Sequence, residues 1–383
     1  MNICIIGWYG TETIGDRAIL AGILSFLGEA FSGCKILLGS LYPFFSERTV
    51  CEDADLWEKI LRKKIRIEIF NSQERSALDK AIDSSDLIIM GGGPLMHIDP
   101  LFMVEYAFKK AKKKNKKTAI MGCGVGPLFT LKHQKSVVSI LENADIIILR
   151  DSLSLKNIEL IYKKLNICLN SNSFYISLDP AVKCALASRP FLNSFNDNYL
   201  ALNLRDFPGE YSKKNNRLKI NRRLINYVEN LSIKFNDTKI LLIPMHYFCI
   251  GGDDRVFLNK ISRITNKKNI HVQNKPLNTF ETMEIYVNAN LNIGMRFHSI
   301  VLQTILNGNN YIIDYTEPNK GKIYGFIKDV DTEMFYKNRY INIQKKEHSI
   351  DFEYELDEKF CINEKLLSEN MDIYVQKLLG LFL

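Results

Sequence analysis

The chain has 383 residues, of which 46% are hydrophobic and 25% are charged. This composition is typical of a globular protein and excludes an intrinsically disordered or a collagen-like chain. The length predicts roughly two to three domains. The net charge of +8 favours anionic partners, which include small molecules, lipids and nucleic acids, without choosing among them.

No apolar run reaches the ~18 residues that a membrane-spanning helix needs. The first residues, Met1–Gly7, have neither the basic leader nor the long apolar segment of a secretory signal. The eight cysteines are scattered singly and form no C-x-x-C pair, which indicates buried thiols rather than a zinc site or a disulfide framework. We therefore expect a cytoplasmic protein.

The first half alternates short apolar runs with longer helical segments, which is typical of a parallel α/β sheet. Most of the runs are apolar throughout, as expected of strands that are covered on both faces. A helix is expected over residues 17–31, where apolar residues recur on one face. The predicted strands are Ile3–Gly7, Lys35–Leu38, Ile65–Phe70, Asp86–Met90, Thr118–Met121 and Asp145–Leu149.

Residues 186–199 are polar and contain Pro190 with several Asn and Ser residues, which predicts a linker. The alternation then restarts, so the chain is expected to hold two similar α/β halves. The predicted strands of the second half are Tyr199–Leu204, Lys239–Pro244, Ile270–Val272, Leu291–Gly294 and Tyr311–Asp314. Residues 363–383 predict an amphipathic helix that packs back onto the body.

Glycine-rich segments follow three of the strands in the first half, at residues 7–16, 91–94 and 122–127. Glycine lets backbone N–H groups approach a ligand closely, so these turns are candidate contacts for a phosphate or a sugar. Tight strand-to-helix turns are the alternative explanation. Asp16 is either a catalytic carboxylate or the N-cap of the following helix. The candidate ligand contacts are Gly10, Gly15, Gly92, Gly93, Gly124 and Gly126.

Arginine and histidine follow three strands of the second half. Arg205, His246 and Arg296 come within two residues of the ends of predicted strands, and His298 begins the next helix. Open α/β sheets bind ligands at the carboxyl ends of their strands, which favours a site over chance clustering. Arginine offers a planar fork for phosphate or carboxylate, and histidine changes charge near neutral pH. The pattern predicts an anionic substrate and proton transfer.

Other charged patterns have local explanations. Arg150-Asp151 and Asp179-Pro180-Ala181 are expected to form an ion pair and a turn, with a direct catalytic role as the alternative. The lysine run at residues 109–117 is expected to be a solvated helix end, with anionic lipid as the alternative partner. Nucleic acid is disfavoured because no aromatic residues interleave with the lysines. Asp329-Val330-Asp331 is expected to be a surface turn rather than a metal site.

Taken together, these motifs resemble the polysaccharide pyruvyl transferase family from Met1 to about Lys322. The usual first loop of the family has Asn where Thr13 stands here. The motifs are Gly7-x-Tyr9-Gly10 with Ile14-Gly15-Asp16, Gly91-Gly92-Gly93, Gly122-x-Gly124-x-Gly126-Pro127, Arg150-Asp151, Asp179-Pro180-Ala181 and Met295-Arg296-x-His298.

The resemblance implies two Rossmann-like domains of the glycosyltransferase B type that face a central cleft. Residues 1–190 would form the acceptor domain, residues 196–350 the donor domain and residues 351–383 a C-terminal extension with its helix. It also implies transfer of pyruvate from phosphoenolpyruvate onto two hydroxyls of a sugar, as a ketal, with no metal and no cofactor besides this donor. The acceptor would belong to a capsule, exopolysaccharide or cell-wall glycan or its lipid-linked precursor, which leaves attachment to the inner face of the plasma membrane open.

The implied reaction assigns roles to the strand-end residues. Arg205, Arg296 and Lys320 are expected to bind the phosphate and the carboxylate of the donor. His298 is expected to be the general acid that protonates the enol carbon. His246 is the second choice, as acid or phosphate ligand.

Two other functions remain open. A nucleotide-sugar-dependent glycosyltransferase would use Arg296 to neutralise a diphosphate leaving group. A non-catalytic glycan-binding protein would not need two arginines and two histidines at strand ends.

Overall fold

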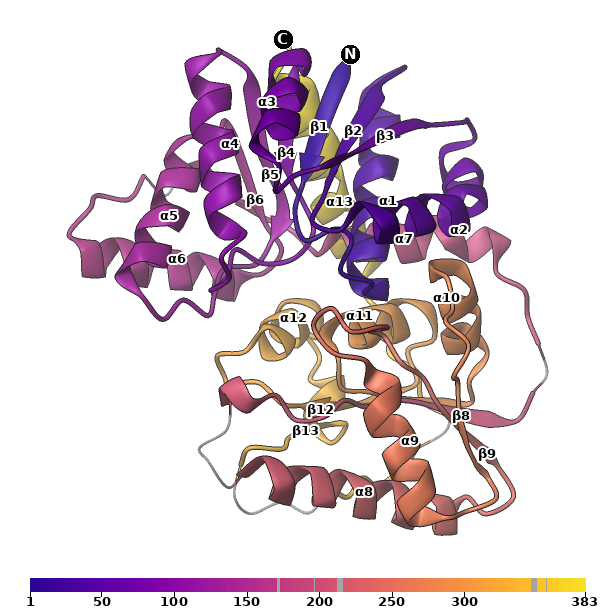
Figure 1. The fold of residues 1–383 in the computed structure, drawn as a ribbon. Coiled ribbons are helices and arrows are strands. Elements are labelled where there is room, and N and C mark those ends of the chain that lie inside the picture. Colours follow the sequence, from indigo (N-terminus) through magenta and orange to yellow (C-terminus); the bar gives the residue numbers. More distant parts are fainter. Residues whose placement is uncertain (171–172, 196, 212–215, 346–349, 356) are drawn as a thin grey trace. The chain divides into compact units, whose positions relative to one another are not determined.

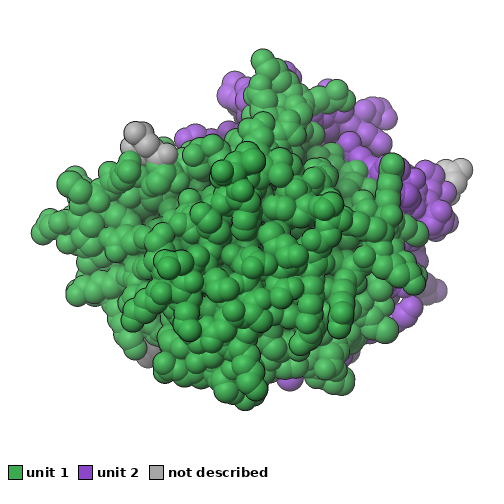
Figure 2. Space-filling model, turned by 90° about the horizontal axis from the view of Figure 1, so that it is seen from above, with its two compact units in different colours: residues 1–12, 16–188, 364–383 green, residues 13–15, 189–363 purple. Residues whose placement is uncertain are grey.

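The structure, a computed structural model, describes the chain except residues 171–172, 196, 212–215, 346–349 and 356 (Figure 1). The chain divides into two compact units, which Figure 2 distinguishes by colour. The first unit comprises residues 1–12, 16–188 and 364–383, and the second comprises residues 13–15 and 189–363. The division at 188/189 lies within the expected linker. The stretch 351–383 is not a separate extension, because residues 351–363 belong to the second unit and the rest to the first.

The first unit is built on a seven-stranded, fully parallel sheet with the order β3-β2-β1-β4-β5-β6-β7. Its six predicted strands are present, and the seventh, at the edge beside β6, was not predicted. The strands are β1 (Asn2–Ile6), β2 (Lys35–Ser40), β3 (Arg66–Asn71), β4 (Leu87–Met90), β5 (Lys117–Cys123), β6 (Ile146–Leu149) and β7 (Phe174–Ile176).

Helices cover both faces of this sheet, with α3, α4 and α5 on one side and α1, α7 and α13 on the other (Figure 1). The first helix begins three residues earlier than predicted. The helices are α1 (Ile14–Ala30), α2 (Pro43–Leu61), α3 (Arg75–Ser84), α4 (Leu101–Lys113), α5 (Leu131–Glu142), α6 (Ser152–Leu165), α7 (Pro180–Ser188) and α13 (Glu364–Gly380).

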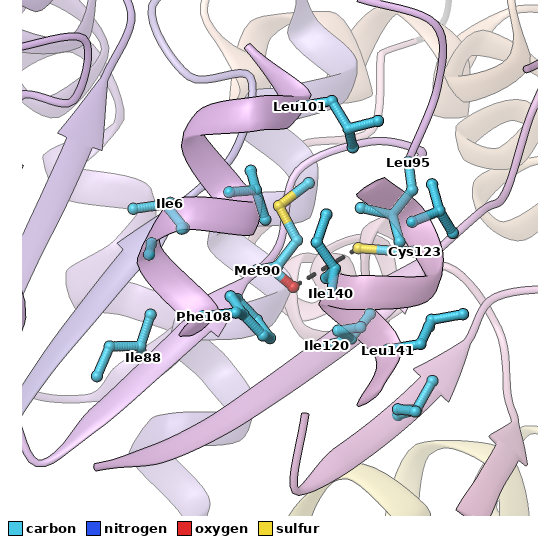
Figure 3. Packing of buried hydrophobic residues seen from close by; sticks show 14 of the residues in the cluster. Ile6, Ile88, Met90, Leu95, Leu101, Phe108, Ile120, Cys123, Ile140 and Leu141 are labelled. Atoms are coloured by element: carbon cyan, nitrogen blue, oxygen red, sulfur yellow. Dashed lines mark hydrogen bonds between the residues drawn. The ribbon is translucent and has the colours of Figure 1, made fainter. Parts of the chain in front are cut away.

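The core of the first unit lies between the central strands and helices α4 and α5 (Figure 3). Met90 and Ile120 of neighbouring strands pack with Phe108 of α4 and Ile140 of α5, and all four side chains are fully buried. Truncating a buried phenylalanine to alanine typically costs about 3–5 kcal/mol, so this packing is a main source of stability. The all-apolar strands are explained by this two-sided cover.

The second unit repeats the architecture with a six-stranded parallel sheet in the order β10-β9-β8-β11-β12-β13. Helices α8 and α9 cover one face, and α10, α11 and α12 cover the other (Figure 1). The strands are β8 (Tyr199–Asn203), β9 (Lys239–Leu242), β10 (Ile270–Val272), β11 (Leu291–Gly294), β12 (Asn310–Asp314) and β13 (Tyr340–Asn342). The helices are α8 (Asn216–Lys234), α9 (Asp254–Thr265), α10 (Thr279–Asn288), α11 (Phe297–Leu306) and α12 (Lys322–Val330).

The C-terminal helix α13 packs onto the first unit, as predicted. The ring of Tyr374 stacks on Phe26 of α1 with centroids 4.2 Å apart, and its hydroxyl donates a hydrogen bond to the Leu178 carbonyl at 2.6 Å. Ser177 donates a second hydrogen bond to the Asn370 carbonyl. The final helix therefore completes one face of the first unit although it is the last element of the chain.

The prediction that the cysteines are buried is correct for only part of the set. Cys4, Cys123 and Cys184 are buried, and burial raises the pKa of each of these thiols to about 12. Cys51, Cys168, Cys249 and Cys361 are exposed.

Candidate functional site

The second unit brings the predicted arginines and histidines to one edge of its sheet. Strands β9, β8, β11 and β12 are consecutive neighbours, and the segments that leave their carboxyl ends carry His246, Arg205, Arg296 and Tyr315 respectively. His298 lies in the first turn of α11, directly after Arg296. This edge of the second sheet, with these five residues, is the candidate site.

Asn203, the last residue of β8, holds three of these strand ends together. Its side-chain oxygen accepts hydrogen bonds from the Arg296 backbone N–H and the Ser299 hydroxyl, both at 2.9 Å. Its side-chain amide donates to the Ile243 carbonyl after β9 at 2.8 Å. Asn203 is fully buried. Its role was not predicted, although a polar residue at the end of an otherwise apolar strand could have indicated it.

Arg296 forms a two-point ion pair with Asp254, the first residue of α9. Nε of Arg296 lies 2.7 Å from one carboxylate oxygen of Asp254, and Nη2 lies 2.6 Å from the other. Asp254 also accepts the backbone N–H groups of Met245 and His246. Asp314, at the end of β12, accepts hydrogen bonds from the backbone N–H and the hydroxyl of Thr316. Because Nε and Nη2 both contact Asp254, the guanidinium is held in a fixed orientation, and Nη1 is the guanidinium nitrogen that takes no part in this pair.

The two histidines lie against the segment 13–15, which belongs to the second unit. A Cβ atom on Gly15 would lie 2.0 Å from Nδ1 of His298, so only glycine leaves room for this imidazole. Thr13 forms a β-bridge with His246, and the Ile14 N–H donates to the Met245 carbonyl at 3.0 Å. Gly15 therefore shapes the site by admitting a side chain, a role that nothing in the sequence pattern indicated.

Tyr315 is buried among cations, with an exposed fraction of 3%. The guanidinium of Arg205 lies 5.2 Å from the centre of its ring. Burial alone would raise the pKa of the Tyr315 phenol, but the positive charges of Lys322, Arg205 and Arg296 outweigh burial and lower it. Tyr315 was not singled out in the sequence, where an aromatic residue after an apolar strand looks like part of the core.

Lys320, which was expected to bind the donor, lies at the surface, whereas Lys322 lies near Tyr315. The ammonium of Lys320 pairs with Glu317 at 3.0 Å, and both side chains are largely exposed. Lys322, at the first position of α12, is half-buried, and its charge acts on Tyr315. The turn between β12 and α12 determines which lysine faces the strand ends, and the sequence does not show the path of that turn.

The glycines of the first unit are explained by the protein's own side chains. A Cβ atom on Gly92 would lie 2.9 Å from the ring of Tyr9, and one on Gly93 would lie 2.6 Å from the ring of Trp8. Both glycines also have positive φ angles. At Gly124 the space is filled by the guanidinium of Arg150. These positions require glycine without any ligand.

Gly10 and Gly126 also have local explanations. A Cβ atom on Gly10 would lie 2.5 Å from the Ser40 hydroxyl oxygen. Gly126 has a φ of +99° and precedes a cis bond to Pro127. Three glycine-rich strand ends therefore do not by themselves indicate a ligand site in this unit.

Asp16 is not the N-cap of α1, because the helix already begins at Ile14. Asp16 lies in the first helical turn, where a carboxylate is favoured by the helix dipole. Its carboxylate accepts a hydrogen bond from the Thr11 hydroxyl at 3.1 Å. This contact closes the loop that precedes the helix.

Arg150, Asp151 and Asp179 form the expected local structure. Asp151 caps α6 by accepting the Ser154 N–H at 2.6 Å. Arg150 pairs with Asp179 at 3.2 Å, and both side chains are almost fully buried. A buried pair of this kind fixes the end of β6 against the turn that precedes α7.

An ion network in the first unit was not predicted. Arg48 pairs with Glu12 at 2.6 Å and with Glu52 at 2.7 Å, and Arg17 pairs with Glu52 and Asp53. Burial raises the pKa of Glu12 despite the nearby arginines. The feature of the sequence that could have indicated this network is Glu12, a charged residue inside the glycine-rich segment 7–16 between two apolar elements.

No helix among the described residues is long and apolar enough to cross a membrane.

The lysine-rich end of α4 is largely neutralised by carboxylates. The pairs are Lys109 with Glu105, Lys110 with Asp79, Lys112 with Asp145 and Lys114 with Asp83. This pairing supports the interpretation of the run as a solvated helix end. The Asp-x-Asp string is not a surface turn as a whole, because Asp329 and Val330 end helix α12 and Val330 is buried. Only Asp331, which follows the helix, stabilises a turn, by accepting the backbone N–H groups of Phe335 and Tyr336.

Comparison with solved structures shows the fold alone. The UDP-GlcNAc 2-epimerase of Methanocaldococcus jannaschii, in complex with UDP-GlcNAc and UDP, gives a TM-score of 0.53 at 13% identity, covering 98% of this chain and 93% of that chain. The UDP-GlcNAc 2-epimerase of Neisseria meningitidis bound to UDP-GlcNAc gives 0.51 at 10% identity, covering 99% and 100%. No curated protein matches the sequence. The expected pair of Rossmann-like domains is confirmed.

The family model described as polysaccharide pyruvyl transferase matches residues 14–318. The match includes the segment 14–15 beside His298 and all five residues of the candidate site. It covers most of the chain and ends before α12. The chain belongs to the polysaccharide pyruvyl transferase family.

Proposed function

We propose that this protein transfers the pyruvyl group of phosphoenolpyruvate onto two hydroxyls of a sugar, forming a ketal and releasing phosphate. The observation that carries the proposal is the group of three cations around Tyr315, formed by Arg205 and Arg296 after neighbouring strands and by Lys322 at the start of α12. Phosphoenolpyruvate has a phosphate and a carboxylate, and charge-assisted hydrogen bonds from several cations are needed to bind both. Family membership supplies the reaction class.

Arg296 is suited to the phosphate because its orientation is set before the donor binds. Asp254 holds Nε and Nη2, and Asn203 holds the backbone of the same residue. A side chain that is already ordered loses little conformational entropy on binding. Nη1 of Arg296, the half-buried Lys322 and Arg205 then share the two anionic groups of the donor.

His298 is the proposed general acid of the first step. The methylene carbon of the enol takes a proton from the imidazolium and becomes a methyl group, while the first sugar hydroxyl adds to the central carbon. The proton of this hydroxyl returns to the imidazole. His246, held by its backbone N–H to Asp254, is the second candidate for the acid or a phosphate ligand.

The acceptor that we propose is a sugar of a surface polysaccharide or of its lipid-linked precursor, on the cytoplasmic side of the membrane. Lys113, Lys116 and Lys117, in and just after the last turn of α4, are the residues through which peripheral attachment would occur. Sedimentation with vesicles of phosphatidylglycerol tests this attachment. Binding that survives Lys→Ala substitution at these three positions would contradict it.

A nucleotide-sugar-dependent glycosyltransferase is the second candidate, and one observation favours it. The chain shares its fold with epimerases whose structures contain UDP-GlcNAc. In that case the arginines would neutralise a diphosphate leaving group rather than a phosphoenolpyruvate phosphate.

One donor panel separates the two candidates. The protein is incubated with a range of sugar acceptors and either phosphoenolpyruvate or nucleotide sugars, and the products are analysed by mass spectrometry. We expect acceptors that gain a pyruvate ketal, with phosphate released in equal amount. Consumption of a nucleotide sugar with phosphoenolpyruvate left intact would show that the second candidate is correct.

A further inference from the structure

Tyr315 is a buried phenol that lies among the cations of the candidate site. The phenol follows β12 directly, and the charges that act on it are Lys322 from α12, Arg205 after β8 and Arg296 after β11. The neighbouring Asp314 carboxylate is turned to Thr316 and Tyr340. The groups facing the phenol are therefore the same cations that we propose bind the phosphate of the donor.

Other buried tyrosines of the second unit differ from Tyr315. Burial raises the pKa of Tyr286 and Tyr336, whose surroundings hold no comparable group of cations. The hydroxyl of Tyr199 donates a hydrogen bond to the Ile285 carbonyl at 2.7 Å, which is the usual structural role of a buried phenol. Tyr315 instead lies 5.2 Å below a guanidinium, with the ring of Tyr211 edge-on at 5.8 Å. The nearby cations would stabilise a phenolate formed at Tyr315.

We propose that Tyr315 is a catalytic residue that protonates the phosphate as it leaves. This inference rests on the proposed function and assigns Tyr315 to the second half of the reaction. After the first hydroxyl has added, the central carbon carries a methyl group, a carboxylate, the new sugar oxygen and the phosphate. The bond between this carbon and the bridging phosphate oxygen must then break, and an unprotonated phosphate trianion is a poor leaving group.

In this half-reaction Tyr315 gives up one proton and later takes one back. The hydroxyl of Tyr315 gives its proton to the bridging oxygen as the carbon–oxygen bond breaks, so phosphate departs as the hydrogen phosphate dianion. The phenolate remains among Arg205, Arg296 and Lys322. The second sugar hydroxyl attacks the central carbon and gives its proton to the phenolate. His298 handles the proton of the first hydroxyl and Tyr315 that of the second, so both residues end the cycle as they began it.

Donor binding also sets the starting protonation of Tyr315. The negative charge of a bound phosphate offsets the surrounding cations, and this raises the pKa of the phenol. The phenol is therefore protonated when donor is present, which is the form that the step requires. When pH rises through the pKa of the phenol in the complex, the acid form is lost and turnover falls.

The test is Tyr315→Phe in the full-length protein, with Tyr199→Phe as the matched control. Wild-type protein is first shown to release phosphate from phosphoenolpyruvate with an acceptor. We expect Tyr315→Phe to lower turnover by ~10²-fold or more, with KM for phosphoenolpyruvate little changed. Rapid quenching should reveal the phosphate-bearing adduct of acceptor and donor, because addition still occurs and elimination is slow. Tyr199→Phe should lower Tm and leave turnover unchanged.

The outcomes are distinguishable. A wild-type protein that leaves phosphoenolpyruvate intact overturns the proposed function and the role of Tyr315 with it. Normal wild-type turnover together with near-normal turnover of folded Tyr315→Phe overturns the role of Tyr315 alone. A raised KM with unchanged kcat would show that Tyr315 only positions Arg205.

A second measurement does not depend on turnover. The ultraviolet difference titration of wild-type protein against Tyr315→Phe reports tyrosinate formation at this position. We expect an inflection below the ordinary pKa of tyrosine, which inorganic phosphate shifts upward. An inflection at or above the ordinary pKa, or one that is insensitive to phosphate, would contradict the proposal.

Discussion

The two units have the same architecture and use their strand ends differently. In the first unit, Gly92 and Gly93 make room for the rings of Tyr9 and Trp8, and the ion pair of Arg150 with Asp179 is closed and buried. In the second unit, three cations and a buried phenol gather at the ends of neighbouring strands. Glycine-rich loops in a parallel sheet therefore do not by themselves indicate a ligand site here, and the gathered cations of the second unit are the basis of the proposed one.

Among the changes in the second unit, replacement of His298 is expected to have the largest effect on turnover. His298→Ala removes the proposed acid of the first step, so turnover should fall by ~10²-fold or more with donor affinity less affected. The measurement is steady-state phosphate release, with His271→Ala on the exposed face of β10 as the control. Near-normal turnover of folded His298→Ala would move the role to His246.

Gly15→Ala tests the same residue without removing it. The added methyl group would lie 2.0 Å from Nδ1 of His298, so the imidazole must move. We expect turnover to fall as in His298→Ala while the imidazole is still present. Unchanged turnover in Gly15→Ala would show that the position of His298 is not critical.

Arg296→Lys separates geometry from charge. Lysine keeps the charge and cannot both hold Asp254 at two points and reach a phosphate. Losing one charge-assisted hydrogen bond costs roughly 1.5–3 kcal/mol, which corresponds to about a tenfold to hundredfold fall in kcat/KM for phosphoenolpyruvate. Wild-type kinetics in Arg296→Lys would mean that Arg296 acts as a point charge, and Arg205 would then be the next residue to test.

The pair Lys322→Ala and Lys320→Ala tests which lysine serves the site. Removing Lys322 should weaken donor binding by about tenfold, as expected for one charged contact of roughly 1.5 kcal/mol. Lys320→Ala should change neither KM nor kcat, because its ammonium is paired with Glu317 at the surface. The reverse order of effects in a calorimetric titration with phosphoenolpyruvate would restore Lys320 to the site.

Gly93→Ala is expected to have the smallest effect on the reaction and a clear effect on stability. The new Cβ would lie 2.6 Å from Trp8 at a φ of +89°, which costs on the order of 1–3 kcal/mol in the free energy of unfolding. Chemical denaturation measures this loss. A folded variant with normal stability and lost donor binding would indicate that the glycine approaches a ligand after all.

The sequence predicted most of the fold because short apolar runs alternate regularly with longer helical segments. The two parallel sheets and the C-terminal helix follow from periodicity. The edge strands β7 and β13, of three residues each, were not predicted, whereas the equally short edge strand β10 was. Helices α2 and α3 begin without side-chain cap hydrogen bonds, and no predicted element lies over them.

The candidate site was predicted only in part. Strand-end positions indicated Arg205, His246 and Arg296, because parallel strands bring their carboxyl ends to one edge. Asp254 was not indicated, since its pairing with Arg296 joins two elements far apart in the chain. A reader of the sequence also cannot tell Lys320 from Lys322, because the choice depends on the turn after β12.

The most direct test of the account uses phosphoenolpyruvate with heavy oxygen in the bridging position, in deuterium oxide. Cleavage between the central carbon and the bridging oxygen predicts that the released phosphate carries the heavy oxygen. Protonation of the enol carbon from exchangeable groups predicts one deuterium in the methyl group of the sugar ketal. Heavy oxygen retained in the sugar product, or a methyl group without solvent deuterium, would contradict the account.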